Sequence, residues 1–221
     1  MKVKFFAAIM AMSICLAACG PKESTPQAQT SEESMPEELT SEELTSEELE
    51  NYSAYLRGWD CYGFLLSSYD DVREADMGEV FYSGAGLAER PGEEAVEAYL
   101  QAAGQEEVYT DLICIPATKM DELLIEKTGY SLQEMKDAGN DLQTVYLKEY
   151  DAYFGEAGDT NYLSVTCTSG TENADGTVTL ECESGMEDGD DYTIVHRCTV
   201  TLDRDTRRFI SNVITDGYKV D

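Results

Sequence analysis

The sequence is poor in basic residues and contains a single histidine. Its 221 residues include 15 Lys and Arg against 45 Asp and Glu, a formal net charge of −30. Phosphate groups are bound by Lys/Arg surfaces that displace counterions, so nucleic acid is excluded as a partner. The same charge balance excludes electrostatic adhesion to an anionic membrane. With one histidine, metal and catalytic sites built on two imidazoles are excluded as well.

The short motifs of the common enzyme classes are also missing. There is no Gly-x-Ser-x-Gly nucleophile elbow, no Ser three residues before a Lys, and no Cys-x-x-Cys pair. The acidic runs 187–191 and 203–205 fit no twelve-residue calcium loop, so we interpret them as solvated turns. Carboxylates are so frequent that a pair at glycosidase spacing arises by chance. We therefore assign no catalytic residue, no metal site and no cofactor.

No hydrophobic run is long enough to span a membrane, which takes about 20 apolar residues. The longest, Phe5 to Leu16, follows a short basic start and predicts a signal peptide over residues 1–18. Leu16-Ala17-Ala18-Cys19 resembles the bacterial lipobox. The resemblance implies cleavage before Cys19, diacylglycerol on its sulfur and acylation of the new amino terminus, because stable anchoring takes more than one acyl chain. An ordinary secretory peptide cleaved elsewhere is the alternative.

Residues 19–45 lack aromatic side chains and are rich in Glu, Ser, Thr and Pro. A five-residue repeat, Glu-Glu-Leu-Thr-Ser, begins at Glu37 and again at Glu42. Such a composition cannot bury enough apolar surface to offset the entropy of ordering, so we expect a disordered acidic tether. Like charges along it repel and extend the chain, which holds the following domain away from the membrane.

Residues 46–221 carry the signals of a single α+β domain. Thr45 and Glu48 form a capping box for a first helix that ends before Gly58. Apolar spacing and caps predict further helices over 77–82, 93–103, 118–128, a short one from Ser131, and 142–154, with a possible strand over 112–115. From residue 161 the period changes to two, and four strands follow, with a hairpin turn at Asn173–Gly176. The expected fold is N-terminal helices packed on a C-terminal antiparallel four-stranded sheet.

Two resemblances accompany this interpretation. Residues 142–216, a sheet with helices on its concave side, resemble the architecture of cystatin-like and nuclear-transport-factor-like folds. The segments Gly63–Asp70 and Ala75–Gly86, with 150–153, 159–162 and 209–212, resemble uncharacterised secreted lipoproteins of clostridia-like Gram-positive bacteria. That resemblance implies a shared fold and location and brings no activity or catalytic residue.

Five cysteines remain after removal of Cys15 and lipidation of Cys19, namely Cys61, Cys114, Cys167, Cys182 and Cys198. The last three are in phase with the apolar residues of their strands. Counting from the turns places Cys167 opposite residue 179 and Cys182 opposite residue 193, which predicts no disulfide among the three. Buried free thiols, one disulfide with Cys61 or Cys114, and a catalytic thiol remain open. His196, two residues from Cys198 on the same face, is a base or a hydrogen-bonded core residue.

Aromatic residues offer the one candidate binding surface. A groove that stacks on sugars or grips a peptide could be lined by Trp59, Tyr62, Tyr69, Tyr82, Tyr146, Tyr150 and Tyr153, although the same spacing suits core positions. Two functions follow. The first is a lipid-anchored, non-enzymatic binding module on the extracytoplasmic face of the bacterial membrane, with a cell-wall glycan, peptide or protein partner. The second is a hydrolase that acts on envelope material or glycans through carboxylates.

Overall fold

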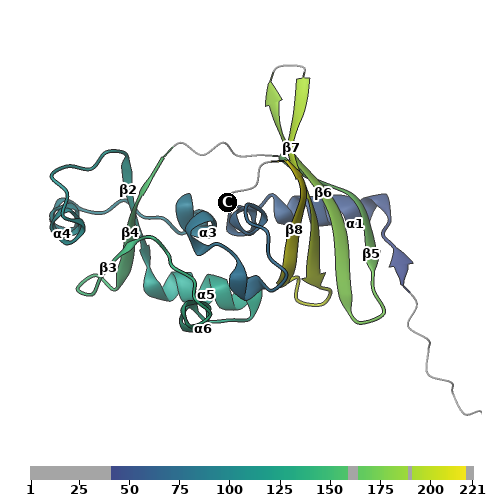
Figure 1. Ribbon diagram of the computed structural model, residues 1–221, viewed down its shortest axis with the longest axis horizontal. Helices are drawn as coiled ribbons and strands as arrows, with labels where there is room; N and C mark the ends of the chain where they lie inside the picture. The colour runs from purple at the N-terminus through teal and green to yellow at the C-terminus, as the bar shows by residue number, and fades with distance from the viewer. Residues whose placement is uncertain (1–40, 159–163, 189–190, 218–221) are drawn as a thin grey trace, which may run out of the picture. The chain divides into compact units, whose positions relative to one another are not determined.

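The computed structural model describes residues 41–158, 164–188 and 191–217 (Figure 1). The predicted signal peptide, the lipidation site Cys19 and most of the tether lie outside these residues. Within them, no helix has both the length and the apolar character needed to cross a membrane.

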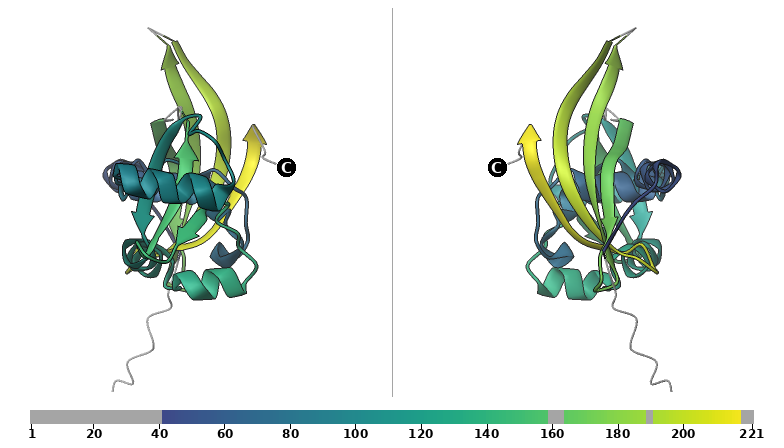
Figure 2. Two further views of the ribbon diagram at one scale, coloured as in Figure 1. Left: turned by 90° about the vertical axis from the view of Figure 1, so that its left-hand side faces the viewer. Right: turned by 90° about the vertical axis from the view of Figure 1, so that its right-hand side faces the viewer.

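The described strands form two antiparallel sheets, which confirms the α+β class. The larger sheet has five strands in the order β1-β5-β6-β7-β8, and the smaller has three in the order β2-β4-β3. The strand bounds are β1 Glu42–Glu43, β2 Asp111–Pro116, β3 Val145–Leu147, β4 Ala152–Ala157, β5 Ser164–Glu172, β6 Thr177–Asp188, β7 Asp191–Asp203 and β8 Phe209–Gly217. The β6–β7 hairpin extends past its neighbours at one end of the larger sheet, and the strands of that sheet curve strongly (Figure 2).

The described helices precede strands β5 to β8 of the larger sheet in the chain, as predicted, and follow its short first strand β1. They are α1 Ser46–Leu56, α2 Trp59–Tyr62, α3 Met77–Tyr82, α4 Glu93–Ala103, α5 Ala117–Thr128 and α6 Leu132–Asp137, with short 3-10 turns that include η1 Gly63–Leu65. The capping boxes of Thr45 with Glu48 and of Ser131 with Glu134 are both present. Because these side chains satisfy backbone N–H groups that have no partner within the helix, both helices begin at the predicted residues. Helix α5 begins one residue before Thr118, directly after Pro116.

The predicted helix over residues 142–154 is wrong, because this segment forms β3, a turn and β4. Its apolar residues lie on two opposite faces of a strand: Tyr153 packs in the larger core, and Ala152 and Phe154 pack in a second one. Asp151 adopts a left-handed conformation, with φ 46°, that reverses the chain before β4. Successive side chains of a strand buried on both sides are all apolar, and such a run is easily mistaken for a helix.

Two hydrophobic cores result. The larger lies between the helices and the five-stranded sheet, and its fully buried side chains include Phe64, Leu124 and Phe209. The smaller forms where α4 packs on one face of the three-stranded sheet, around Tyr99 and Phe154 (Figure 1).

Asn212 on β8 joins the helical segment to the larger sheet. Its side chain is fully buried, and its Nδ2 donates to the carbonyl oxygens of Leu65 at 3.2 Å and Ser67 at 2.7 Å. Its backbone exchanges two hydrogen bonds with Tyr69, with N···O distances of 2.6 and 2.9 Å. Four hydrogen bonds from one residue therefore attach the segment after α2 to β8.

The larger sheet has one strand more than predicted, because part of the expected tether pairs with it. Glu42 and Glu43 form β1 opposite Glu172 and Thr171 of β5. Further along the same edge, the Ser53 hydroxyl of α1 accepts a hydrogen bond from the Cys167 amide at 2.8 Å. Arg57, the residue directly after α1, donates to the Val165 carbonyl, also at 2.8 Å.

The predicted register of the cysteines is wrong as well. Cys182 lies directly opposite Cys167 on one side and Cys198 on the other. The register shifts between Cys167 and Ser169, and again between Ser184 and Gly185. The observed partners lie three and five residues beyond the predicted residues 179 and 193, because both hairpins reverse further along the chain than the count assumed. Each bulge, which inserts one unpaired residue into a strand, changes the pairing by one residue.

Candidate functional site

The seven aromatic residues proposed for a groove do not form one surface. Tyr62 and Tyr69 are buried in the larger core, and the Tyr69 hydroxyl donates to the Phe64 carbonyl at 3.1 Å. Trp59 is 56% exposed and lies at the start of α2. The Tyr146 ring packs on the Tyr153 ring, with centroids 4.9 Å apart. Tyr82 and Tyr153 line one cavity, and Tyr150 lines a second, separate cavity.

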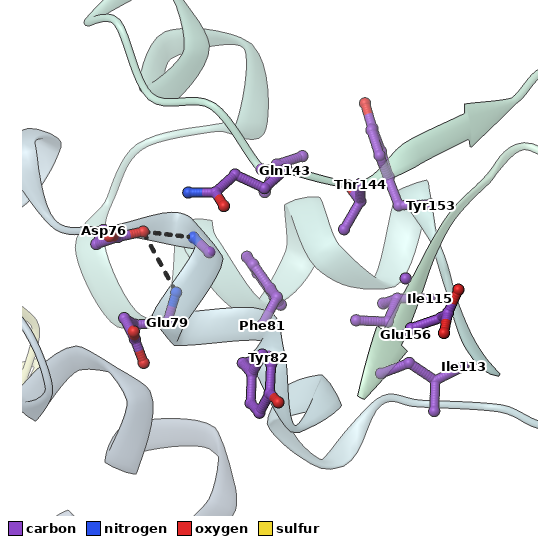
Figure 3. Close-up of a pocket in the computed structure, with 13 residues that line it drawn as sticks. Asp76, Glu79, Phe81, Tyr82, Ile113, Ile115, Gln143, Thr144, Tyr153 and Glu156 are labelled. Carbon is purple, nitrogen blue, oxygen red and sulfur yellow. Dashed lines mark hydrogen bonds between the residues drawn. The ribbon is translucent and has the colours of Figure 1, made fainter. Parts of the chain in front are cut away.

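The cavity that holds Tyr82 and Tyr153 lies between α3 and the three-stranded sheet, and we call it the α3 pocket (Figure 3). Its volume is about 340 Å³. It is lined by Asp76, Gly78, Glu79, Phe81, Tyr82, Ile113, Ile115, Leu142, Gln143, Thr144, Tyr153, Gly155 and Glu156. A pocket of this size takes a small ligand or a few residues of a peptide.

Close packing between two backbones sets the position of α3 beside the sheet. A Cβ atom on Gly63 of η1 would lie 2.5 Å from the Val80 Cα and 2.7 Å from the Val80 carbonyl oxygen. Only glycine permits such an approach, so Gly63 brings α3 against η1. Asp76 begins the helix, because its Oδ1 accepts from the amides of Gly78 at 2.8 Å and Glu79 at 3.3 Å.

The floor of the α3 pocket is apolar and its rim is polar. Phe81 and the two isoleucines of β2 supply the floor, while Gln143 and Thr144 come from the segment before β3 (Figure 3). Leu142 adds a further apolar side chain to the lining. Gln143 adopts a left-handed conformation, with φ 50°, which is costly for a residue that has a side chain. The buried Thr144 hydroxyl has no hydrogen-bond partner among the described residues. Strain and an unpaired hydroxyl at one rim are features of ligand sites.

The ionisable side chains of the pocket are mainly acidic, and the lining includes no Lys, Arg or His among the described residues. Burial, and then repulsion from Asp76, raises the pKa of Glu79 above its ordinary value. The Asp76 carboxylate is committed to capping α3. The Glu156 carboxylate is also committed, because it accepts from the Tyr99 hydroxyl at 3.2 Å and from the amides of Tyr109 and Thr110. Glu79 is therefore the carboxylate available to a ligand.

A second cavity of about 550 Å³ lies on the opposite face of the three-stranded sheet, beside α4. Its lining includes Pro91, Cys114, Tyr150 and Phe154. The half-buried Cys114 thiol contacts the Glu89 carbonyl at 3.6 Å. Burial and the Glu89 charge raise the pKa of Cys114, which disfavours the reactive thiolate.

The candidate nucleophile and base lie away from both cavities. His196 and Cys198 are buried in the larger sheet and line neither cavity. No group of three or more potential metal ligands occurs among the described residues. Among the described residues that line the α3 pocket, Glu79 therefore supplies one free carboxylate rather than a pair, and it lies at the edge of the pocket (Figure 3).

Sequence patterns do not single out the polar rim. Gln143 and Thr144 fall in the segment predicted to be helical, and Glu79 is one of many acids. The Asp76 cap three residues before Glu79 marks the start of α3 but gives no sign of a pocket.

No protein-family profile matches the chain, and no curated protein or solved structure matches it either.

Proposed function

We propose that this protein is a lipid-anchored, extracytoplasmic binding module and that the α3 pocket is its ligand site. The half-buried Glu79 carboxylate, at the edge of a pocket whose described lining has an apolar floor and no basic residue, carries the proposal. The lining lacks a Ser or Cys nucleophile and the protein's only histidine, which favours binding over hydrolysis. A hydrolase would need a second free carboxylate.

The chemistry of the pocket favours a ligand that has an amine and an apolar body. A cationic amine restores the partner that a half-buried carboxylate lacks, and such charge-assisted hydrogen bonds are the strong ones. The apolar body would cover Phe81 and the isoleucines of β2. Among the cell-surface partners, a short peptide with a free amine fits these groups best.

Replacing Glu79 tests this site. We expect Glu79→Gln to weaken binding of short apolar peptides that contain one lysine by roughly 10- to 100-fold, the contribution of a hydrogen bond to a charged group. Binding can be measured by calorimetry on the full chain, with the lysine-acetylated peptides as ligand controls. Glu97→Gln, an exposed change on α4, should leave affinity unchanged. Equal affinity of the Glu79→Gln variant and the parent protein would refute the pocket assignment.

Affinity should also depend on pH through Glu79. Because the pKa of Glu79 is raised, its carboxylate becomes protonated at a higher pH than an ordinary glutamate. The ion pair with an amine is present above this raised pKa and is lost as the pH falls through it. Calorimetric titrations over a pH series should show this loss in the parent protein, and the Glu79→Gln variant should bind with little pH dependence.

The anchor is tested by two cysteine variants of the full chain in a bacterial host. Metabolic labelling with a clickable fatty acid should mark the parent protein, and membrane fractionation should recover it with the membranes. Cys19→Ala should abolish the label, whereas Cys15→Ala, which changes a cysteine of the predicted signal, should retain it. Labelling of the Cys19→Ala variant would contradict the anchor and leave the pocket assignment untouched.

A further inference from the structure

Three buried cysteines form a row across the centre of the larger sheet. Cys167 on β5, Cys182 on β6 and Cys198 on β7 are direct neighbours in the register of the three strands. Their side chains are almost completely buried, and the Sγ atoms of Cys167 and Cys182 are 3.5 Å apart. All five cysteines of the described residues are free thiols.

Two bulges create this row. Thr168 is the unpaired residue between Cys167 and Ser169, and Val195 is the unpaired residue between Ile194 and His196. In uninterrupted hairpins, Cys167 would face Glu183 and Cys182 would face Arg197. Each bulge shifts the register by one residue, and the two shifts together align three cysteines on one buried face.

The geometry of Cys167 and Cys182 matches a disulfide site. Opposed residues of antiparallel strands have Cα atoms about 4.5–5.5 Å apart, within the span that a disulfide bridges. The Cys167 amide donates to Ser53 rather than across to β6, which identifies the closer, non-hydrogen-bonded type of pair. One S–S bond can therefore form without moving either backbone.

We propose that Cys167 and Cys182 are a disulfide site, oxidised by thiol–disulfide exchange with an extracytoplasmic disulfide oxidant, and that Cys198 is left as the adjacent free thiol. The presence of this oxidant rests on the proposed extracytoplasmic location of the protein. The alignment of the three cysteines is independent of that location.

The exchange balances in two steps. The Cys167 thiolate attacks the oxidant disulfide and releases the first oxidant thiol, which leaves a mixed disulfide on Cys167. The Cys182 sulfur then attacks the Cys167 sulfur, loses its proton and releases the second oxidant thiol. Two protein thiols are oxidised, and one oxidant disulfide is reduced to two thiols.

The position of Cys182 in the middle of the row makes it the shared sulfur. Hydrogen bonding from Cys182 lowers the pKa of both Cys167 and Cys198, and His196 lowers that of Cys198 further. Hydrogen bonding to its two neighbours raises the pKa of Cys182. The thiolate therefore forms on Cys167 or Cys198, at either end of the row, rather than on Cys182. If Cys167 is removed, Cys198 remains as a partner for Cys182.

Burial dictates when oxidation occurs. A soluble oxidant cannot reach thiols covered by α1 and the folded core, so the exchange belongs to folding, before the sheet closes over the row. The closed loop of about 15 residues restricts the unfolded chain. The oxidised protein should melt about 6–12 °C above the reduced protein.

The test is refolding of the reduced full chain, with Cys15→Ala and Cys19→Ala, in a glutathione redox buffer. After alkylation in denaturant, we expect two of the five remaining thiols to be protected. No Lys or Arg lies between residues 149 and 196, so trypsin leaves Cys167 and Cys182 in one peptide. A glutamyl endopeptidase cuts after Glu172 and allows the linkage to be mapped.

Three variants sharpen the result. Cys182→Ala should leave every remaining thiol reactive, Cys167→Ala should move the disulfide to Cys182–Cys198, and Cys114→Ala should leave the Cys167–Cys182 linkage intact. Five reactive thiols after refolding of the parent protein overturn the proposal, and so does a disulfide that includes Cys61 or Cys114. Mapping of the parent protein decides the matter even where a variant fails to fold.

Discussion

Asn212→Asp is expected to lower the free energy of unfolding by about 3–5 kcal/mol at neutral pH. Asn212 is fully buried, and its Nδ2 donates to the carbonyl oxygens of Leu65 and Ser67. The isosteric carboxylate places a negative oxygen against these two acceptors and buries a charge that has no partner. The loss should be visible in urea unfolding of the full chain.

The penalty should depend strongly on pH. Burial raises the pKa of the introduced carboxyl group above its value in the unfolded chain. The penalty is therefore small below the unfolded pKa of about 3.9, grows as the pH rises and levels off above the raised folded pKa. Asn51→Asp, the same change at an exposed position of α1, should shift stability by at most about 0.5 kcal/mol. A pH-independent loss at Asn212 would mean that its hydrogen bonds, rather than a buried charge, determine the effect.

The second large effect is expected at Gly63, where the added methyl group of Gly63→Ala has no room. Its Cβ would lie 2.5 Å from the Val80 Cα, so α3 must move away from η1. Overpacking of this kind costs about 1–3 kcal/mol, and we expect the upper end because both contacting groups are backbone atoms. Displacement of α3 carries Glu79 and Phe81 with it. Affinity for the amine-bearing peptides should therefore fall together with stability.

Gly92→Ala is the matched control, because a Cβ atom there meets nothing within 4 Å and the backbone has an ordinary φ of −75°. Its melting temperature and peptide affinity should stay close to those of the parent protein. If Gly63→Ala weakened folding but left affinity intact, the ligand would bind elsewhere than against α3.

Local signals in the sequence predict the starts of α1 and α6 and four of the strands of the larger sheet, β5 to β8. The side chains of Thr45 and Ser131 act on backbone groups within one helical turn, so no distant contact can override them easily. The turn at Asn173–Gly176 is equally local. These elements alone define the α+β class.

Tertiary contacts decide the remainder. The segment 142–154 has apolar residues at helical spacing, but its strands are buried between two cores that the sequence does not reveal. The α3 pocket depends on that segment, because Gln143 and Thr144 line it only when the chain there is not helical. The cysteine row depends on bulges at Thr168 and Val195, which no local pattern marks.

The acidic repeat and α1 together cover the outer edge of strand β5, to which a strand of another molecule could otherwise pair. An uncovered edge strand offers free N–H and C=O groups to which another copy can add a strand. On β5, Glu42 and Glu43 occupy one stretch of that edge, and Ser53 and Arg57 satisfy backbone groups on another. The short strand β1 therefore protects this edge against aggregation between neighbouring molecules.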